Sequence, residues 1–160
     1  MQIRKFDKSF LKAGFDCGDE VLNGFIKQQA NQIIRRNETV IHCAVKDQTV
    51  IGFYTLSSCE IRRSVDDVLL KKQSPYTPIP CALIGRLAVD KNYKGQGIGA
   101  DLLLHALQTV VNLSKHIGMA FVVVDAKNEQ AKAFYERYGF SVLSQQPMRL
   151  CYPVKDIPRL

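Results

Sequence analysis

The chain has 160 residues, of which 46% are hydrophobic and 23% charged, a composition ordinary for a globular protein with one core. No apolar run approaches the roughly 20 residues that span a bilayer, and no apolar segment follows the basic N-terminus, so we expect neither a membrane protein nor a signal peptide. The net charge of +7 favours a polyanionic partner such as RNA, although a basic soluble surface explains it equally well.

The cysteines indicate a reducing compartment. They are odd in number, scattered along the chain and without a C-x-x-C pair, which argues against a disulfide framework and against a zinc site. Small buried apolar side chains are the simplest interpretation of Cys17, Cys43, Cys59, Cys81 and Cys151. We therefore expect a cytoplasmic protein with no metal centre.

The first part of the chain predicts a strand followed by an amphipathic helix. Residues 3–10 mix apolar and basic side chains and predict the strand. Apolar residues then recur at helical spacing through residues 21–36. Asp16 or Asp19 can cap the start of this helix, and Asn37 follows its end.

A long hairpin is predicted next. Residues 39–46 have apolar side chains on both faces, as a central strand does, and residues 49–61 predict its partner across a tight turn at Asp47 and Gln48. His42 lies within the first of these strands. We interpret it as a histidine packed in the sheet, because no nucleophile lies near it in the sequence.

The middle of the chain leads into a second apolar strand. Ser64 suits the cap of a short helix over residues 65–72, and the proline-rich residues 73–80 predict a loop. Residues 81–89 predict a strand that is apolar apart from Arg86. An arginine in such a run either extends its charge to an edge or points into an active-site cleft, and we favour the cleft.

A glycine-rich turn separates this strand from a long helix that keeps one apolar face until Gly118. The order of strand, glycine turn and helix is typical of a phosphate-binding element. Glycines let the backbone approach an anion, and the first N–H groups of the helix have no partner within it. The spacing G-x-G-x-G over residues 95–99 matches neither a Rossmann fingerprint nor a P-loop.

The last third of the chain predicts a short buried strand at residues 119–124 and a helix over residues 129–138, capped by Asn128 and closed by Gly139. The C-terminal segments can then form a closing antiparallel pair, from 140–143 and 148–154. Neither internal repeats nor a linker interrupt the pattern. The whole chain, residues 1–160, therefore predicts a single α/β domain with a mixed sheet.

Two segments of the chain resemble signatures of the GNAT (GCN5-related) N-acetyltransferases. The first is the glycine turn, which resembles the family's coenzyme A loop with Lys94 where the family usually has Arg or Gln. The second is N-x-x-A-x-x-x-Y-x-x-x-G-F, which residues 128–140 match in the expected order, about 30 residues later. The resemblance implies the GNAT fold, with a central sheet splayed at the cofactor site, and an acetyltransferase that uses acetyl-CoA.

The resemblance also implies which residues bind the cofactor. Backbone groups of Leu87, Ala88 and Val89 would bond the pantetheine arm in the gap between the two splayed strands. The loop and the second signature supply the remaining candidates, which are Lys94, Gly95, Gln96, Gly97, Ile98, Gly99, Ala100, Asn128, Ala131 and Phe134.

Tyr135 matches the family residue that assists the departing thiolate. It lies four residues after Ala131 and therefore on the same helix face, where the small alanine leaves room for the cofactor. A phenol, with a pKa near 10, is a weaker acid than a thiol near 8.5, so hydrogen bonding to sulfur is expected to be its main contribution. Phe134 and Tyr138, on a neighbouring face, are also typical of core aromatics.

No general base stands out among Glu60, His42 and Asp125. A peptide α-amino group has a pKa of about 7.7–8.0. In an amino acid ester, the ester group withdraws charge and lowers the pKa of the α-amino group below that of the free amino acid. Such an amine is substantially neutral at cellular pH, so water suffices as the proton acceptor. A lysine side chain, with a pKa near 10.4, would need a base far more.

Less specific sequence segments, spread along nearly the whole chain, are similar to segments of the GNAT toxins of bacterial toxin–antitoxin pairs. They are FDCGDEVLNGFI, IGFYTLSS, IGRLAVD and AKAFYERYGF. The resemblance implies acetylation of the α-amino group of aminoacyl-tRNA, inhibition of translation, a ribbon-helix-helix antitoxin as partner, and a homodimer. Basic candidates for RNA contacts are Arg35, Arg36, Lys71, Lys72 and Arg86, and the pair at Arg62 and Arg63 has the same character.

Two other functions remain open from the sequence. The first is a GNAT enzyme that acetylates a small amine or a protein N-terminus, and the +7 charge argues for the RNA substrate over it. The second is a non-catalytic module that only binds coenzyme A or a partner. The intact glycine loop and Tyr135 argue against that module.

Overall fold

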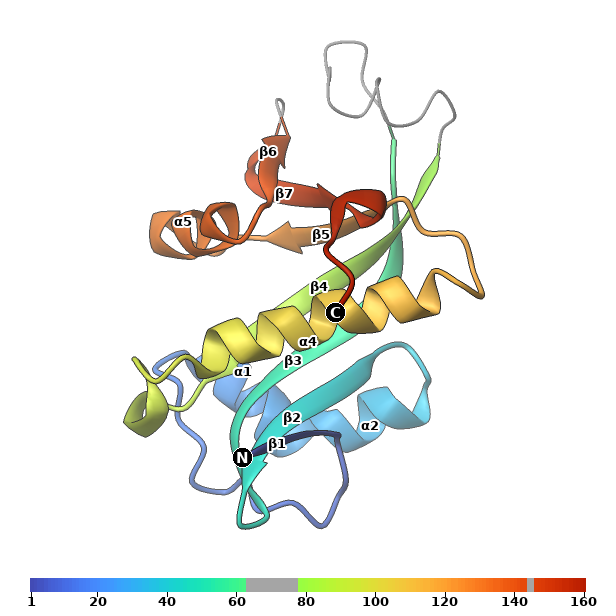
Figure 1. Ribbon diagram of the computed structural model, residues 1–160. Helices are drawn as coiled ribbons and strands as arrows, with labels where there is room; N and C mark the ends of the chain where they lie inside the picture. Colours follow the sequence, from blue (N-terminus) through green and yellow to red (C-terminus); the bar gives the residue numbers. More distant parts are fainter. Residues whose placement is uncertain (63–77, 144–145) are drawn as a thin grey trace. The chain divides into compact units, whose positions relative to one another are not determined.

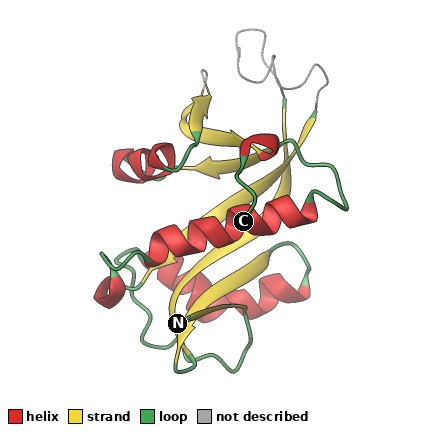
Figure 2. Cartoon of the chain, in the orientation of Figure 1, coloured by secondary structure: helices red, strands yellow, loops and turns green. Residues whose placement is uncertain are grey.

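Figure 1 shows the protein as a computed structural model, which describes residues 1–62, 78–143 and 146–160. Within these ranges a seven-stranded sheet has the strand order β1-β2-β3-β4-β5-β7-β6. It mixes parallel and antiparallel pairs and carries flanking helices (Figure 2), so the predicted α/β fold with a mixed sheet is confirmed. The helix predicted at 65–72 and most of the loop predicted at 73–80 lie outside the described residues.

The strands are β1 (Gln2–Lys5), β2 (Val40–Lys46), β3 (Thr49–Ile61), β4 (Ile79–Val89), β5 (Phe121–Asp125), β6 (Ser141–Leu143) and β7 (Gln146–Pro153). The α-helices are α1 (Glu20–Gly24), α2 (Ala30–Arg35), α4 (Ile98–Leu113) and α5 (Glu129–Arg137). A π-helical turn, η1 (Phe25–Gln29), joins α1 to α2, and short 3-10 turns are η2 (Lys91–Tyr93) and η3 (Val154–Asp156). None of these helices is long and apolar enough to cross a membrane.

The described residues form two compact units. The first contains residues 1–57 and 85–106, and the second contains residues 58–84 and 107–160. The boundaries fall inside β3, β4 and α4, so each unit is assembled from two separate segments of the chain.

The first unit is built on the predicted hairpin of β2 and β3. Asp47 and Gln48 form its turn, and both have positive φ, 52° and 66°, the conformation of a two-residue turn that matches the twist of the strands. The first strand is shorter than the predicted 3–10, because β1 ends at Lys5. The carboxylate of Asp7 then accepts a hydrogen bond from the Ser9 N–H at 2.8 Å and turns the chain out of the sheet.

The predicted helix at 21–36 is present from Glu20 to Arg35 but is not continuous α-helix, since η1 interrupts it. Asp19 is the N-cap, as one of the two predicted alternatives, and its carboxylate accepts from the N–H groups of Val21 and Leu22. Asn37 ends the helix with φ 56°. The core of this unit packs the buried helix residues against the hairpin and the end of β4, through Phe15, Phe25, Ile26, Ile41, Phe53 and Ala88.

The second unit contains the parallel pair of the sheet. β4 pairs with β5 from Cys81 to Ile84, β5 pairs antiparallel with β7, and β7 pairs antiparallel with β6, as predicted for the C-terminal segments. β4 begins at Ile79, inside the segment predicted as a loop. Pro80 has no N–H to donate, and it is tolerated at this exposed position because only its carbonyl needs a partner. That carbonyl accepts a hydrogen bond from the Ala120 N–H at 2.8 Å.

Helix α4 ends earlier than predicted, at Leu113 rather than near Gly118. The hydroxyl of Ser114 donates to the Val111 carbonyl at 2.6 Å, and the Lys115 N–H bonds three residues back, to Asn112, at 3.2 Å. The polar residues there therefore tighten the last turn into irregular structure. Such side-chain competition with the helix backbone is typical of serine.

Four cysteines are buried as predicted, namely Cys17, Cys43, Cys81 and Cys151. Cys59 differs, because it is only half-buried and packs at the margin of the core of the second unit. That core also holds Cys81 and Cys151 among the side chains of Ile79, Phe121, Val123 and Leu143. A hydrogen bond with Cys59 and burial raise the pKa of the Cys81 thiol.

Candidate active site

The glycine-rich loop of the first unit connects the end of β4 to α4. Gly95 and Gly97 have φ of 80° and 81°, a region in which residues with a side chain are strained. A Cβ placed on either glycine would meet no atom within 4 Å, so their α-carbons face open space. The Asp101 N–H bonds to the Gly97 carbonyl at 3.0 Å, which places Gly97 at the entrance of α4. The loop therefore fits a phosphate group, because exposed backbone meets the positive end of a helix.

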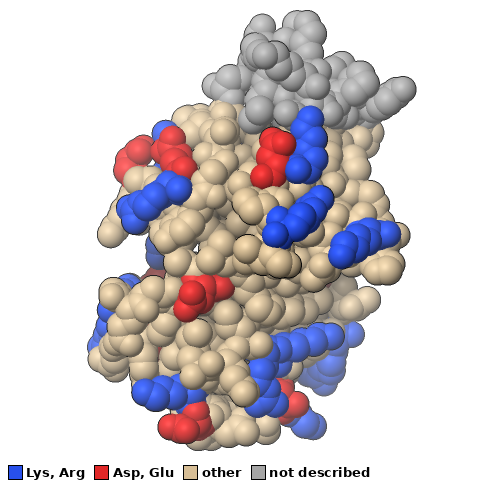
Figure 3. Space-filling model, viewed as in Figure 1, with Lys and Arg blue, Asp and Glu red and all other residues tan. Residues whose placement is uncertain are grey.

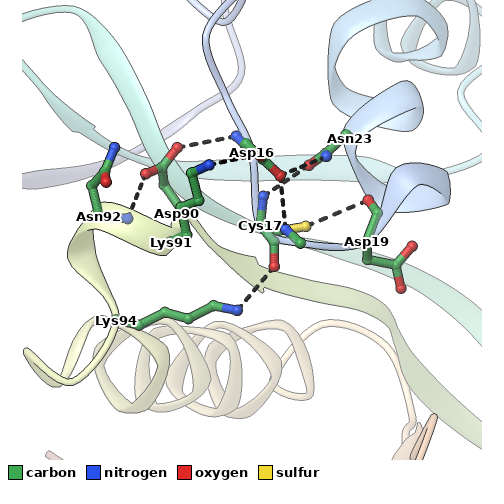
Figure 4. Close-up of polar contacts among 9 residues, drawn as sticks. Asp16, Cys17, Asp19, Asn23, Asp90, Lys91, Asn92 and Lys94 are labelled. Carbon is green, nitrogen blue, oxygen red and sulfur yellow. Dashed lines mark hydrogen bonds and ion pairs between the residues drawn. The ribbon is translucent and has the colours of Figure 1, made fainter.

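The turn before the loop is anchored by Asp90, which is buried with 6% of its surface exposed. Its two carboxylate oxygens accept from the backbone N–H groups of Asn92 at 2.9 Å and of Asp16 at 3.1 Å (Figure 4). The second contact joins residues 74 positions apart in the sequence. The N-terminal segment thus holds the start of the loop.

Asp16 strengthens this anchor through its own carboxylate. The carboxylate accepts from the Gly18 N–H and from the Asn23 side-chain amide, and it pairs with the Lys91 ammonium at 3.2 Å (Figure 4). These contacts, above all the hydrogen bond from Gly18, lower the pKa of Asp16 to about 2. The carboxylate therefore stays ionised at any physiological pH.

Lys94 is also part of the anchor. Its ammonium donates to the Cys17 carbonyl at 2.9 Å, so this side chain holds the loop against the N-terminal segment (Figure 4). Asn23, 5% exposed, in turn accepts from the Cys17 N–H at 2.9 Å. Sequence reasoning missed Asp16, Asn23 and Asp90 as supports of the site, and only the pattern of Asp and Asn around the turns pointed to local hydrogen bonding.

In β4, which leads into the loop, successive side chains point to opposite faces of the sheet. Ala88 is buried in the core of the first unit, whereas Leu87 and Val89 are half-buried on the opposite face. A Cβ on Gly52 would lie 3.0 Å from the Ala88 carbonyl oxygen, so β3 needs a glycine where it passes this segment. Leu87 and Val89 are therefore the side chains that the first unit leaves partly open beside the loop.

The second signature lies in the second unit, on α5. Asn128 is the N-cap, as predicted, and its side-chain oxygen accepts from the Ala131 N–H at 2.8 Å. Gly139 ends the helix with φ 107°, and a Cβ there would lie 2.7 Å from the Tyr152 ring. Both ends of α5 are thus fixed, which fixes the direction of its side chains.

Tyr135 is buried on α5, with 8% of its surface exposed. Its ring packs edge-on against Phe140 at 5.6 Å and against Phe134 at 5.3 Å between ring centroids. Burial raises the pKa of its phenol to about 12, so the hydroxyl keeps its proton at neutral pH. The group can therefore donate a hydrogen bond but cannot act as a base there. Phe134 also contacts Tyr138 at 5.1 Å, as expected for their spacing.

The three candidate bases differ in what surrounds them. Asp125 forms two hydrogen bonds with the Arg149 guanidinium, at 2.7 and 2.9 Å, a pairing that the sequence did not reveal. Glu60 is exposed and lies 3.8 Å from Arg62. His42 stacks on Tyr54 at 4.8 Å, which confirms its interpretation as a histidine packed in the sheet.

His42 belongs to a small cluster with Tyr54 and His105, which sequence reasoning missed. The Tyr54 hydroxyl lies 2.8 Å from Nδ1 of His105, and the two imidazole rings are 5.3 Å apart. Burial, then the nearby His105 and Lys5, lowers the pKa of His42 to about 4. The imidazole is therefore neutral at cellular pH.

The predicted RNA-binding residues are spread over the chain. Arg35 and Arg36 are exposed at the end of α2. Arg86 is half-buried on β4, with its guanidinium 3.8 Å from the centre of the Phe25 ring, and desolvation lowers its pKa. Lys71 and Lys72 lie outside the described residues. Figure 3 shows Lys and Arg side chains in several separate groups on the visible face, with acidic side chains among them.

Residues 5–140 match the model of the Acetyltransferase (GNAT) family. Among characterised relatives, a probable toxin TacT of Sinorhizobium fredii is 30% identical over 159 residues, which cover 93% of this chain and 88% of that protein. A tRNA-acetylating toxin of Mycobacterium tuberculosis is 29% identical over 144 residues, which cover 89% of this chain and 85% of that protein.

Solved structures of AtaT and of AtaTR are also similar to this chain over nearly its whole length. AtaT complexed with acetyl-methionyl-tRNAfMet has a TM-score of 0.87 at 31% identity and covers 96% of this chain and 95% of its own. AtaTR bound with AcCoA has a TM-score of 0.83 at 32% identity, over 96% and 94%. A mutant of AtaT bound to the C-terminus of the antitoxin AtaR has a TM-score of 0.84 at 30% identity, over 96% and 92%.

Proposed function

The chain belongs to the GNAT acetyltransferase family, and from this premise we propose that it is a toxin that acetylates the α-amino group of aminoacyl-tRNA and so inhibits translation. The observation that carries the proposal is its similarity, over 96% of the chain, to AtaT complexed with acetyl-methionyl-tRNAfMet. The tRNA-acetylating toxin of Mycobacterium tuberculosis supports it independently. Acetylation removes the nucleophile with which the amino acid would form a peptide bond.

We propose acetyl-CoA as the acetyl donor and the glycine loop as its phosphate site. The open space at Gly95 and Gly97 and their positive φ support this fit. Backbone N–H groups of Gly97, Ile98, Gly99 and Ala100 would bind the pyrophosphate, while Lys94 holds the loop in place through the Cys17 carbonyl. The parallel register of β4 ends at Ile84, which supports backbone groups of Leu87, Ala88 and Val89 as partners of the pantetheine arm.

The second signature would complete the cofactor site, with Asn128, Ala131 and Phe134 as its further residues. Ala131 lies in the first turn of α5, and the cap at Asn128 fixes that turn. The donor supplies a thioester whose carbon–sulfur bond breaks as the new amide bond forms. We propose that residues 1–160 act together as one acetyltransferase domain in this reaction.

We propose Tyr135 as the catalytic residue. Its protonated phenol would donate a hydrogen bond to the sulfur as negative charge develops there, and its pKa of about 12 makes complete proton transfer to a thiolate unfavourable. The amine must arrive without its proton. Since an α-amino group with a pKa near 8 is already partly neutral, water can accept the remaining proton, and the pairing of Asp125 with Arg149 is consistent with the lack of a dedicated base.

The proposed partners follow from the same relatives. The mutant of AtaT bound to the C-terminus of the antitoxin AtaR supports an antitoxin for this chain, which we propose to be a ribbon-helix-helix protein. We also propose a homodimer, which the resemblance to the GNAT toxins implies. A cytoplasmic location completes the proposal, because the substrate is charged tRNA. The alternative is acetylation of a small amine or a protein N-terminus.

Purified protein should transfer radiolabel from acetyl-CoA to charged tRNA and leave deacylated tRNA unlabelled, because only the aminoacyl ester carries the nucleophile. Spermidine and a peptide with a free N-terminus serve as parallel acceptors. Label on these acceptors, with none on charged tRNA, would overturn the proposal and establish the alternative. Alkaline hydrolysis should release the label as an N-acetyl amino acid.

A further inference from the structure

A groove in the first unit lies apart from the glycine loop along the sequence. It has a volume of about 520 Å³, within the range of about 300–1,000 Å³ that is common for ligand sites. It is formed by the turn after β1 and by α2, both of which can be followed in Figure 1. Its lining residues are Phe6, Asp7, Lys8, Asn31, Ile34 and Arg35.

The charge of this groove is positive. Lys8 and Arg35 are exposed, and neither belongs to an ion pair among the residues that the structure describes. The Arg35 Nε donates to the Asn31 carbonyl at 3.4 Å, which leaves its two terminal nitrogens for other acceptors. Asp7 adds one negative charge, because the hydrogen bonds from Ser9 lower its pKa and keep the carboxylate ionised, so the lining holds two cations, Lys8 and Arg35, against one anion.

Aromatic rings alternate with cations beside the groove. The Lys12 ammonium lies 4.9 Å from the centre of the Phe6 ring, and the Arg4 guanidinium lies 5.0 Å from the centre of the Phe10 ring. The two rings meet edge-on at 6.3 Å. Phe6 is half-buried and lines the groove, so part of its ring remains available to a ligand.

We propose that this groove binds RNA, with Lys8 and Arg35 on phosphates and an unpaired base against the Phe6 ring. Interleaved cations and aromatic rings are what single-stranded nucleic acid needs, since each nucleotide offers one negative phosphate and one flat base. An acidic peptide would use the cations but would leave the ring without a stacking partner. This inference rests on the proposed function, so the RNA is the tRNA substrate, and the groove is a second contact besides the acetylated end.

The test compares a charge variant with a matched control. Lys8→Ala with Arg35→Ala removes two cations of the groove, and Lys115→Ala with Lys155→Ala removes two exposed cations of the second unit. Binding of labelled tRNA is measured by anisotropy over a salt series. The groove variant should shallow the slope of log K against log salt by roughly 1.4–1.8, since each lost phosphate contact removes about 0.7–0.9. The control pair should leave the slope of the wild type.

Phe6→Leu tests the ring separately. Losing one base–aromatic stack should weaken tRNA binding by roughly 5- to 150-fold without changing the salt slope, because no charge is lost. Phe6 also packs against the core of its unit. Thermal melting and the Kd for acetyl-CoA therefore accompany the binding curve, and both should remain close to wild type.

Kinetics with two substrates, charged tRNA and an amino acid methyl ester, separate this inference from the proposed function. Both groove variants should lower kcat/KM for charged tRNA while acetylation of an amino acid methyl ester continues at the wild-type rate. A wild type that acetylates charged tRNA, with groove variants that bind tRNA like the control pair, would overturn the groove alone. Loss of poly-glutamate binding with tRNA binding intact would overturn it in favour of an acidic protein partner. A wild type that never labels charged tRNA would overturn the proposed function itself.

Discussion

Among single residues, Tyr135 combines a buried position with a retained proton. Phe134 and Phe140 surround its ring, and burial holds the pKa of the phenol at about 12. A base at this position would need an ionised phenol, which neutral pH does not provide. The hydroxyl therefore suits a donor role, and that role is open to a direct test.

Tyr135→Phe should lower kcat by at least about 100-fold while the Kd for acetyl-CoA changes by no more than a few fold, because only the hydroxyl is lost and the ring contacts remain. Rapid-quench kinetics and calorimetry measure the two quantities. Tyr138→Phe removes a hydroxyl from the C-cap of the same helix and should leave kcat unchanged. Near-normal turnover of the Tyr135 variant would exclude the phenol from the reaction.

Sequence reasoning worked for residues whose role depends on near neighbours. Asn128 was found as a cap because its partner lies three residues away, at the Ala131 N–H. It did not find the contacts that the fold creates between distant segments. Asp16 and Asp90 meet over 74 positions, and Asp125 meets Arg149 over 24, and no local pattern encodes such pairs.

Among elements, the glycine loop and the start of α4 should respond to a change in backbone preference. Gly97→Val places a branched side chain at φ 81° and fills the open space that a phosphate would approach, so acetyl-CoA binding should fall below detection by calorimetry. A side chain on Gly97 would meet no core atom within 4 Å, so the circular dichroism spectrum should be retained.

Gly118→Val is the control for this change. Gly118 also faces open space, but its backbone lies outside the left-handed region. It should bind acetyl-CoA like the wild type. Wild-type affinity in the Gly97 variant would show that the loop does not hold the cofactor.

The limits of elements were predicted well where one residue type decides them. Gly139 ended α5, and Asp47 with Gln48 turned the hairpin, as the sequence indicated. The first strand and α4 were predicted too long because hydrogen bonds made by the side chains of Asp7 and Ser114 act against apolar periodicity. The π-turn within 21–36 was not predicted, since apolar spacing of a helix does not distinguish one added residue from regular α-helix.

For the whole molecule, the His42 cluster links stability to pH. The pKa of His42 in the folded state, about 4, lies below its ordinary value of 6.5, so the unfolded chain binds the proton first. The part of the free energy of unfolding that depends on neutral His42 should therefore be fully present above pH 6.5 and be lost as the pH falls toward 4. Urea unfolding at pH 7.5 and pH 5 measures the decline.

His42→Gln should reduce this pH dependence, whatever its effect on stability at neutral pH, because the titrating group is gone. His116→Gln, at an exposed histidine, should keep the pH dependence of the wild type. Equal loss of stability at pH 5 in both variants would remove His42 as the cause. His105, whose pKa burial also lowers, would account for any remaining part.

The family and the mixed sheet were predictable for the whole chain because two signatures fixed the order of β4, α4, β5 and α5. The division into two compact units was not predictable. It depends on where contacts become dense, and its boundaries fall within continuous elements such as β3 rather than at a change of composition.

The π-turn η1 bears on how this sequence can change in length. Its five residues, Phe25–Gln29, hold one residue more than α-helix needs for the same turn, so deleting one codon here would leave an unbroken α-helix. Because the π-turn contains the extra residue within itself, the helix on either side would keep its rotation after the deletion. Asn23 would still face Asp16 and Cys17, its two hydrogen-bond partners. A lineage can therefore lose this codon and keep the anchor of the glycine loop.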